Sequence, residues 1–397
     1  MVFRRLVMGR PPNGSLKCLQ AKSSRYFQRT SCVVESRRRG NVAKMTLLDT
    51  IDDSLPLITT IIPTFRRPRL LRRAITSVLE QTEAPLRVCV YDNASGDETA
   101  DVVRKMADTD ARLGYHCHSA NIGAAANFDF GLHQVSTPLF SILSDDDYLL
   151  PGFYQRARAG LTAHPEAMVW AGMTLHVDEA GTIWYARVRD LPREGLLAPP
   201  EGFMAMTGGM APAWTSIVFR RDVLDIEGFP DPETRGPSDL EYCLRLAARF
   251  PYVLEKYPSA VLTLNSASFS ATQPMSSFWP GWKRMLQRFN DDGDLDQAFK
   301  REALAALRSD AQRMLFRRGA NALAAGRLEF ARDAAEALQD DCGLPGRARL
   351  LRVIAGACEH SALAQRAYTL AYRAAEARIV KSQSALQAKY GSLLRSA

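Results

Sequence analysis

The 397-residue sequence lacks several features that mark common protein classes. No apolar run approaches the roughly 18 to 20 residues that span a bilayer, so a transmembrane segment is not expected. The cysteines are odd in number and never form a C-x-x-C pair, which argues against a disulfide scaffold or a zinc ribbon and favours a reducing cytoplasm. They are Cys18, Cys32, Cys89, Cys117, Cys243, Cys342 and Cys358.

Two further absences concern nucleotides and nucleic acids. No G-x-G-x-x-G follows the first predicted strand, which disfavours a nicotinamide-dependent dehydrogenase. The formal net charge is +8, but residues 55–296 hold 23 Lys and Arg against 30 Asp and Glu. Because the central region is acidic, the overall basic charge does not indicate binding to nucleic acid.

The basic charge is concentrated at both ends of the chain. Residues 1–54 hold eleven Lys and Arg against four Asp and Glu and show no helical or strand period. They are predicted to be a disordered basic extension, either an organellar transit peptide or an upstream extension of a chain that starts at Met45. The sequence does not decide between these two interpretations.

From Leu57 onward, short apolar segments alternate with amphipathic helical segments. This pattern predicts βαβ units and an α/β fold with a mainly parallel sheet over residues 55–270. Residues 271–397 are rich in Ala, Leu and Arg and predict an all-α region, with two helices that meet near Gly326 as in a tetratricopeptide hairpin. The predicted parallel strands cover residues 57–62, 86–92, 112–118 and 138–143.

Polar side chains follow all four of these strands, where ligands bind in open parallel sheets. The fourth strand is followed by Asp145, Asp146 and Asp147, three adjacent carboxylates that repel one another and resist desolvation. A bound Mg²⁺ or Mn²⁺ would offset that repulsion. The alternative is a solvated acidic loop that caps the following helix.

Six segments in this order and spacing resemble family 2 glycosyltransferases with the GT-A fold, over roughly residues 55–260. This resemblance implies an inverting enzyme that moves a sugar from a nucleoside-diphosphate sugar to an acceptor hydroxyl, with help from Mg²⁺ or Mn²⁺. The segments are "PLITTIIPTFRRPRLLRRAITSVLEQT", "VCVYDNASGDETADVV", "NIGAAANFDFGL", "SILSDDDYLLPGFY", "VFRRDVLDIEGFP" and "GPSDLEYCLRLA".

The resemblance assigns roles to the acidic motif. It makes Asp146 the best match to the metal ligand, with Asp147 assisting and Asp145 nearer the donor ribose. The more usual D-x-D-D pattern has an Asp where this chain has Ser144, so the register of the motif differs from the common one.

The resemblance also predicts contacts to the donor nucleotide. Asp92 matches the carboxylate that accepts a hydrogen bond from the base, although "DNASGD" also suits a turn-forming Asp. Pro63, Thr64 and Arg67 match the loop that lies against the nucleotide, and Asn121 falls in the third motif. That motif often has an Arg where this chain has Ala126.

The second half of the domain is expected to bind the acceptor. Asp239 matches the general base, which takes the proton of the acceptor hydroxyl. The residue before it is Ser238 instead of the family's Glu, and Glu241 is the alternative base. Trp214, Thr215 and Glu241 are predicted to line the sugar or acceptor pocket, with core packing as the alternative for Trp214.

Histidines offer a second arrangement that could hold a metal. His116 and His118 lie on the same face of a predicted strand, which is the geometry of a two-ligand metal pair. No third ligand lies nearby in the sequence, so packing on an edge strand is favoured, and the same holds for His176.

The expected donor is a UDP-sugar, and the expected acceptor is a glycan or a lipid-linked molecule in polysaccharide biosynthesis. The basic C-terminal helices suggest peripheral contact with the inner face of a membrane, or a homodimer. Glycoside hydrolysis is disfavoured, because it needs no cluster of adjacent aspartates. A non-catalytic protein that binds nucleotide sugars and recruits a partner remains the alternative function.

Overall fold

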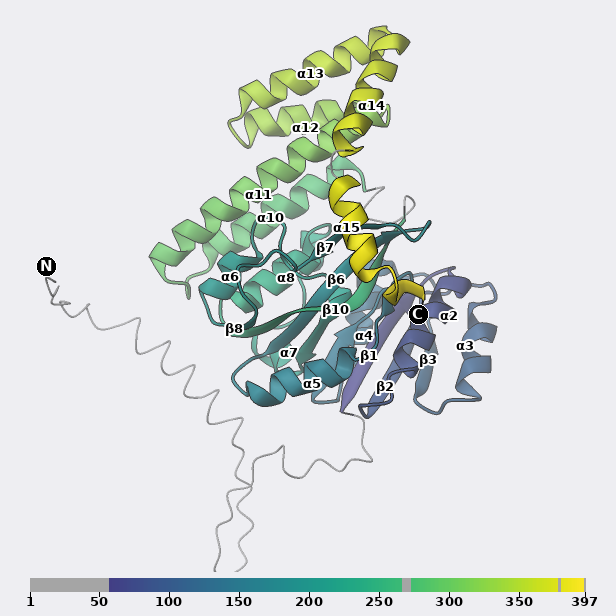
Figure 1. Ribbon diagram of the computed structural model, residues 1–397. Coiled ribbons are helices and arrows are strands. Elements are labelled where there is room, and N and C mark those ends of the chain that lie inside the picture. Colours follow the sequence, from purple (N-terminus) through teal and green to yellow (C-terminus); the bar gives the residue numbers. More distant parts are fainter. Residues whose placement is uncertain (1–56, 266–272, 378–379, 396–397) are drawn as a thin grey trace, which may run out of the picture. The chain divides into compact units, whose positions relative to one another are not determined.

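A computed structural model of the protein describes residues 57–265, 273–377 and 380–395 (Figure 1). The described residues contain a ten-stranded mixed sheet, and residues 56–397 cluster as one unit. The predicted basic extension over residues 1–54 falls outside the described residues. The boundary predicted at residue 270 lies within residues 266–272, which are also outside them.

The first half of the sheet confirms the predicted parallel strands, in the order β3-β2-β1-β4. Strand β1 is buried along its whole length, and its sequence "ITTIIPT" is rich in the β-branched residues Ile and Thr, which favour a strand. The elements are β1 (Ile58–Thr64), α2 (Pro68–Leu79), β2 (Leu86–Asp92), α3 (Thr99–Ala107), β3 (Leu113–Cys117), α4 (Ala124–His133) and β4 (Leu139–Ile142).

Helix α2 shows how the local sequence sets the start of an element. Pro68 occupies its first turn, where a missing N–H costs no hydrogen bond. Leu71, Ala74, Ile75 and Val78 recur at helical spacing and are all buried. The helix therefore packs its apolar stripe inward and begins directly after the carboxyl end of β1.

The second half of the sheet is mixed, and it continues in the order β4-β9-β6-β10-β5. Strands β6 and β10 are parallel, whereas β9 is antiparallel to both β4 and β6. The short strands β5 and β8 were not predicted, because two or three residues carry no periodic pattern. The elements are β5 (Tyr148–Leu149), α5 (Phe153–Ala163), β6 (Val169–Asp178), β7 (Ile183–Arg187), β8 (Gly195–Leu197), α6 (Glu201–Met206), η1 (Trp214–Ser216), β9 (Ile217–Arg220), α7 (Asp222–Ile226), η2 (Pro232–Thr234), α8 (Ser238–Ala247) and β10 (Tyr252–Leu264).

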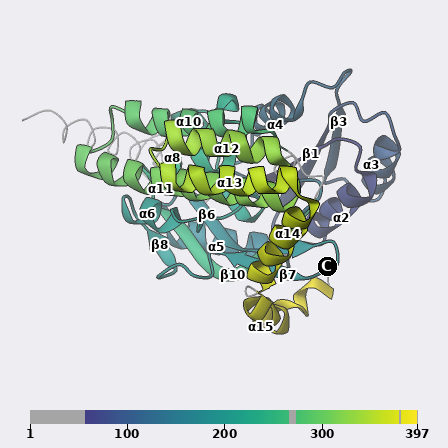
Figure 2. The same cartoon turned by 90° about the horizontal axis from the view of Figure 1, so that it is seen from above.

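The C-terminal region is helical, as predicted, and α11, α12 and α13 lie side by side (Figures 1 and 2). Gly326 separates α11 from α12 in a left-handed conformation, with φ of 73°. Helix α15 returns to the sheet, where the Gln387 side chain accepts a hydrogen bond of 2.9 Å from the Ile183 N–H of β7. No helix within the described ranges is both long and apolar enough to cross a membrane. The helices are α10 (Met275–Asp291), α11 (Gln297–Ala324), α12 (Leu328–Asp340), α13 (Pro345–His360), α14 (Ala362–Ala377) and α15 (Val380–Tyr390).

Candidate active site

The three aspartates lie just beyond the carboxyl end of β4, and all three are buried. Asp145 accepts hydrogen bonds from the Thr64 hydroxyl at 2.7 Å and from Arg67 Nη1 at 3.1 Å. The same Arg67 nitrogen lies 2.7 Å from a carboxylate oxygen of Asp146. The structure therefore brings together Thr64, Arg67 and the aspartates, as the sequence predicts for adjacent strand ends.

Asp147 faces the other half of the sheet. One of its oxygens accepts a hydrogen bond from the Thr215 hydroxyl, and the other accepts one from the Thr263 N–H at 2.8 Å. Burial and the neighbouring Asp146 carboxylate raise the pKa of Asp147 to about 8. Burial likewise raises the pKa of Asp145 to about 6, although Arg67 opposes the shift. The cluster is thus short of positive charge when all three carboxyl groups are ionised.

Asp147→Asn is expected to make the metal-free protein less sensitive to alkaline pH. The folded protein keeps the proton of Asp147 up to about pH 8, whereas the unfolded chain releases it near pH 4. Between these values the folded state binds more protons, so stability falls as the pH rises, and Asn removes this loss. Urea unfolding without divalent ions should show the variant more stable than the parent by at least about 1 kcal/mol at about pH 9.

The matched control for this prediction is Asp101→Asn, since Asp101 is an exposed aspartate on α3. It should keep the pH dependence of the parent. An unchanged pH dependence in Asp147→Asn would mean that Asp147 is ionised in the folded protein at neutral pH.

The chemistry of the aspartates fits a hard divalent cation. Among the described residues, no three His, Cys, Asp or Glu side chains are already arranged as a complete metal site. Mg²⁺, however, is commonly held by one or two carboxylates together with substrate phosphates and water. The predicted ligands Asp146 and Asp147 match that mode, and their buried, mutually repelling charges would be offset by a cation.

Two residues of this site were missed at the sequence level. Arg73 of α2 donates hydrogen bonds to the Asp146 carbonyl and, at 2.9 Å, to the Thr263 hydroxyl. Thr263 stands near the end of β10, 116 positions after Asp147. Arg73 was one of several arginines in the first predicted helix, and only its contact with the Asp146 carbonyl distinguishes it from the others.

Asp92 and Asn121 lie at neighbouring strand ends. Asp92 is buried and accepts hydrogen bonds from the Ser95 N–H at 2.9 Å and from the Tyr115 hydroxyl at 2.7 Å. The first bond confirms the turn-forming role that its sequence suggested. Asn121 is joined to this turn through Asn93, whose amide donates to it at 3.0 Å. In the β1–β2 register, Thr64 lies opposite Asp92.

The histidines pack against aromatic neighbours. His116 stacks on Phe130 with ring centroids 4.7 Å apart, and His118 Nε2 forms a 2.9 Å hydrogen bond with Asn127. His176 stacks on Tyr185 at 4.1 Å, and its burial lowers the pKa well below the usual value. These contacts agree with the packing interpretation.

Asp239 lies in the first turn of α8, and solvent reaches its side chain. Protein atoms nevertheless crowd round the carboxyl group closely enough that desolvation raises its pKa, while the charge of Arg187 opposes the shift. The Asp239 carbonyl accepts a 3.2 Å hydrogen bond from Trp214 Nε1, and Trp214 is followed by Thr215, the partner of Asp147.

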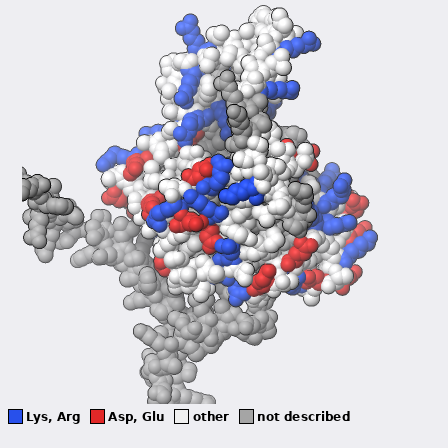
Figure 3. Space-filling view, in the orientation of Figure 1, with Lys and Arg blue, Asp and Glu red and all other residues white. Residues whose placement is uncertain are grey.

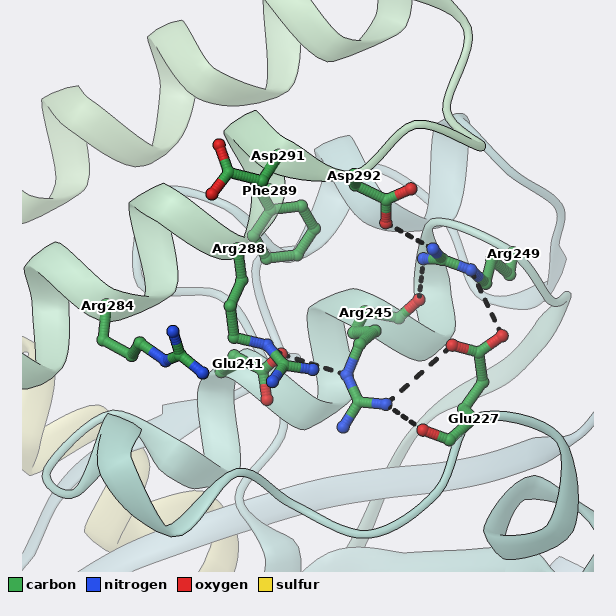
Figure 4. Close-up of a pocket in the computed structure, with 9 residues that line it drawn as sticks. All are labelled: Glu227, Glu241, Arg245, Arg249, Arg284, Arg288, Phe289, Asp291 and Asp292. Atoms are coloured by element: carbon green, nitrogen blue, oxygen red, sulfur yellow. Dashed lines mark hydrogen bonds and ion pairs between the residues drawn. The ribbon is translucent and has the colours of Figure 1, made fainter.

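Glu241 of α8 faces Arg288 of α10 (Figure 4). It is buried, and one of its oxygens accepts hydrogen bonds from Arg245 Nε at 3.0 Å and from Arg288 Nε of α10 at 3.1 Å. The structure thus places Glu241 in an ionic cluster that joins α8 to α10, whereas the sequence predicted it to line the sugar or acceptor pocket. A cavity of about 350 Å³ is lined by Glu227, Glu241, Arg245, Arg249, Arg284, Arg288, Phe289, Asp291 and Asp292.

Arg288→Ala is expected to destabilise the fold by about 2 kcal/mol, because it removes a cation from two buried carboxylates, Glu241 and Asp231. Urea unfolding would measure this loss. The control is Arg104→Ala, since Arg104 forms an exposed pair with Asp101 on α3 and should change stability by no more than about 0.5 kcal/mol. Equal effects of the two variants would show that the cluster adds nothing to stability.

Comparisons with known proteins agree with this geometry. Residues 59–225 match the model of glycosyl transferase family 2. A GalNAc(5)-diNAcBac-PP-undecaprenol beta-1,3-glucosyltransferase of Campylobacter jejuni is 36% identical over 99 residues, 25% of this chain and 32% of that protein. A validoxylamine A glucosyltransferase of Streptomyces hygroscopicus is 30% identical over 150 residues, 36% of this chain and 32% of that protein. The alignments thus span about a third of each relative.

Among solved structures, the chain is similar to S. aureus TarS 1-349 in complex with UDP-GlcNAc. The TM-score is 0.58 at 16% sequence identity, and the match covers 80% of this chain and 92% of that one. The TarS complex with UDP gives 0.55 at 15% identity. Likeness at this level of identity concerns the fold, and it confirms the predicted GT-A arrangement of a mixed sheet with flanking helices and a helical C-terminal region.

Proposed function

Because the chain contains a family 2 glycosyltransferase domain over residues 59–225, we propose that it transfers a sugar from a nucleoside-diphosphate sugar to an acceptor hydroxyl, with inversion. One observation carries this proposal. Arg67 is hydrogen-bonded to the aspartates, and Asp147 is hydrogen-bonded to Thr215. Trp214, the residue before Thr215, is in turn hydrogen-bonded to Asp239. This linkage supports a donor site and a general base that lie close to each other.

The donor nucleotide would lie over the strand ends. We assign Pro63, Thr64, Asp92, Asn121 and Asp145 to the nucleoside, and Arg67 to the diphosphate, which an arginine binds well. Oδ1 of Asp92 accepts one hydrogen bond, whereas Oδ2 accepts two, so Oδ1 keeps a lone pair for a base N–H. UDP is the proposed nucleotide, supported by the UDP and UDP-GlcNAc complexes of the similar TarS structure.

A divalent cation, Mg²⁺ or Mn²⁺, would be held by Asp146 and Asp147. When bound, it would neutralise the charge that develops on the leaving diphosphate. The raised pKa values of Asp145 and Asp147, which arise mainly from burial, support this assignment, because a bound cation would offset the cost of holding their negative charges there. Arg67, which directly precedes α2, and Arg73 of α2 form hydrogen bonds that hold Asp145 and Asp146 in place.

Asp239 is the proposed general base. As the acceptor oxygen bonds to the anomeric carbon, the bond to the diphosphate oxygen breaks on the opposite face of the sugar. The proton of the acceptor hydroxyl passes to the Asp239 carboxylate. Desolvation raises the pKa of Asp239, which makes the carboxylate a better base. Trp214 and Thr215 would line the pocket between the two substrates.

The acceptor is proposed to be a glycan or a lipid-linked molecule, in polysaccharide biosynthesis on the cytoplasmic side of a membrane. The Campylobacter relative supports a lipid-linked acceptor, because its name specifies a PP-undecaprenol compound. The protein would contact the membrane peripherally through its C-terminal helices.

Calorimetric titration of the full chain with UDP, GDP, dTDP and CDP, each with and without Mn²⁺, tests the donor site. The expected result is binding of UDP that Mn²⁺ strengthens, followed by sugar transfer from a UDP-sugar to a screened acceptor. Failure of every nucleotide to bind in the presence of Mn²⁺ would contradict the proposal. Donor binding without transfer to any acceptor would favour the non-catalytic alternative.

A further inference from the structure

Helix α14 uses a polar face to join the rest of the protein. Gln365 donates a hydrogen bond of 2.7 Å to the Leu323 carbonyl of α11, and Thr369 donates one of 3.0 Å to the Ala324 carbonyl. Tyr368 donates to the Ala320 carbonyl at 3.3 Å. These three residues lie on one side of α14, so its inner face is held by hydrogen bonds.

The opposite side of α14 is apolar and faces solvent. Leu363, Ala367, Leu370 and Ala374 recur at intervals of four, three and four residues, which places them on one helix face. Leu363 is 77% exposed and Leu370 is 66% exposed. A surface helix of a globular protein normally has the reverse arrangement, with its apolar stripe facing the core. The outer face of α14 is therefore suited to contact something apolar outside the described fold.

The neighbouring helix α13 also carries exposed apolar side chains. Leu350 is 49% exposed and Val353 is 62% exposed, and α13 packs beside α14. We define the α13–α14 face as Leu350, Val353, Leu363 and Leu370, together with the exposed Ala367 and Ala374.

Positive charge flanks the α13–α14 face. Arg366 and Arg373 lie seven residues apart along one flank of the α14 stripe and are both exposed. Residues 345–375 contain five arginines and a single acidic residue, Glu359, which pairs with Arg332 of α12. Figure 3 shows blue side chains among white surface in the part of the molecule where Figure 1 places these helices.

We propose that the α13–α14 face binds the surface of an anionic phospholipid bilayer. Leu and Val side chains would enter the region between headgroups and acyl chains, while the arginines contact lipid phosphates. A second copy of the chain fits less well, because two such faces would bring arginine-rich flanks together. Membrane binding would hold the transferase beside a lipid-linked acceptor, and for this role the inference rests on the proposed function.

Flotation of the full chain with vesicles tests the proposal without using enzymatic activity. We expect binding to phosphatidylcholine vesicles that contain phosphatidylglycerol, weaker binding to pure phosphatidylcholine, and loss of binding at high salt. The double variant Leu363→Glu/Leu370→Glu should bind the anionic vesicles more weakly than the parent, by a factor of at least about ten. Both sites are exposed, so the helical circular dichroism and the affinity for UDP should remain those of the parent.

The matched control is Ile226→Glu, which places a charge at an exposed apolar residue on α7 and should leave vesicle binding unchanged. Equal binding of the parent and the double variant would overturn the proposal, since the basic residues 1–54 are common to both. A parent that is dimeric by light scattering, with a monomeric double variant, would also overturn it and assign the face to self-association. Vesicle binding needs no donor sugar, so its failure is distinct from failure of sugar transfer.

Discussion

Asp239→Asn is expected to lower the rate of sugar transfer by about 10³-fold while leaving UDP binding unchanged. Asn has nearly the same shape as Asp but cannot accept the proton of the attacking hydroxyl. The backbone carbonyl that bonds to Trp214 is retained, so the start of α8 should keep its position. Steady-state turnover gives the rate, and calorimetry with UDP gives the affinity.

The pH dependence provides a second measurement of the same role. Protonation of Asp239 removes the base, so the rate of the parent should fall as the pH falls through the raised pKa of this residue. Asp222→Asn is the matched control, because Asp222 is also an exposed aspartate in the first turn of a helix, α7. Full activity in Asp239→Asn would show that another group takes the proton.

Asp146→Ala is expected to weaken Mn²⁺-dependent UDP binding by about 100-fold or more. The change removes a proposed metal ligand, and Arg67 can still pair with Asp145 at 3.1 Å. The segment therefore keeps one of its ion pairs, and its fold should persist. Calorimetry with UDP, in the presence and absence of Mn²⁺, would measure the loss.

The control for this variant is Asp101→Ala, which removes an exposed aspartate from α3 and should leave UDP binding unchanged. Urea unfolding should confirm that Asp146→Ala is folded. If a folded Asp146→Ala variant bound UDP with the parent's affinity and metal dependence, the aspartates would be a helix-capping loop without a role in metal binding.

The positions of the first strand ends could be predicted from the sequence, because they depend on local hydrophobic patterns. The apolar run of β1 and the helical spacing in α2 predict a βαβ unit, and parallel strands place their carboxyl ends along one edge. Thr64 and Asp145 were therefore expected to lie near each other, and they are joined by a hydrogen bond of 2.7 Å.

Contacts between distant segments could not be predicted in this way. Arg73 and Thr263 are 190 positions apart, yet they form a hydrogen bond beside the aspartates. Glu241 was expected to face the acceptor, but Arg288 of α10 pairs with it on another side of α8. No single-sequence pattern specifies which arginine meets which carboxylate.

The sequence by itself determined the alternation of strands and helices, the helical C-terminal region and the set of polar residues at the strand ends. These features follow from hydrophobic periodicity, which each segment carries within itself. Only the tertiary structure decided which residues support the aspartates, where Glu241 points, and that α14 turns its apolar stripe outward. Those outcomes depend on packing between elements, where the burial and pairing of one side chain depend on residues far away in the chain.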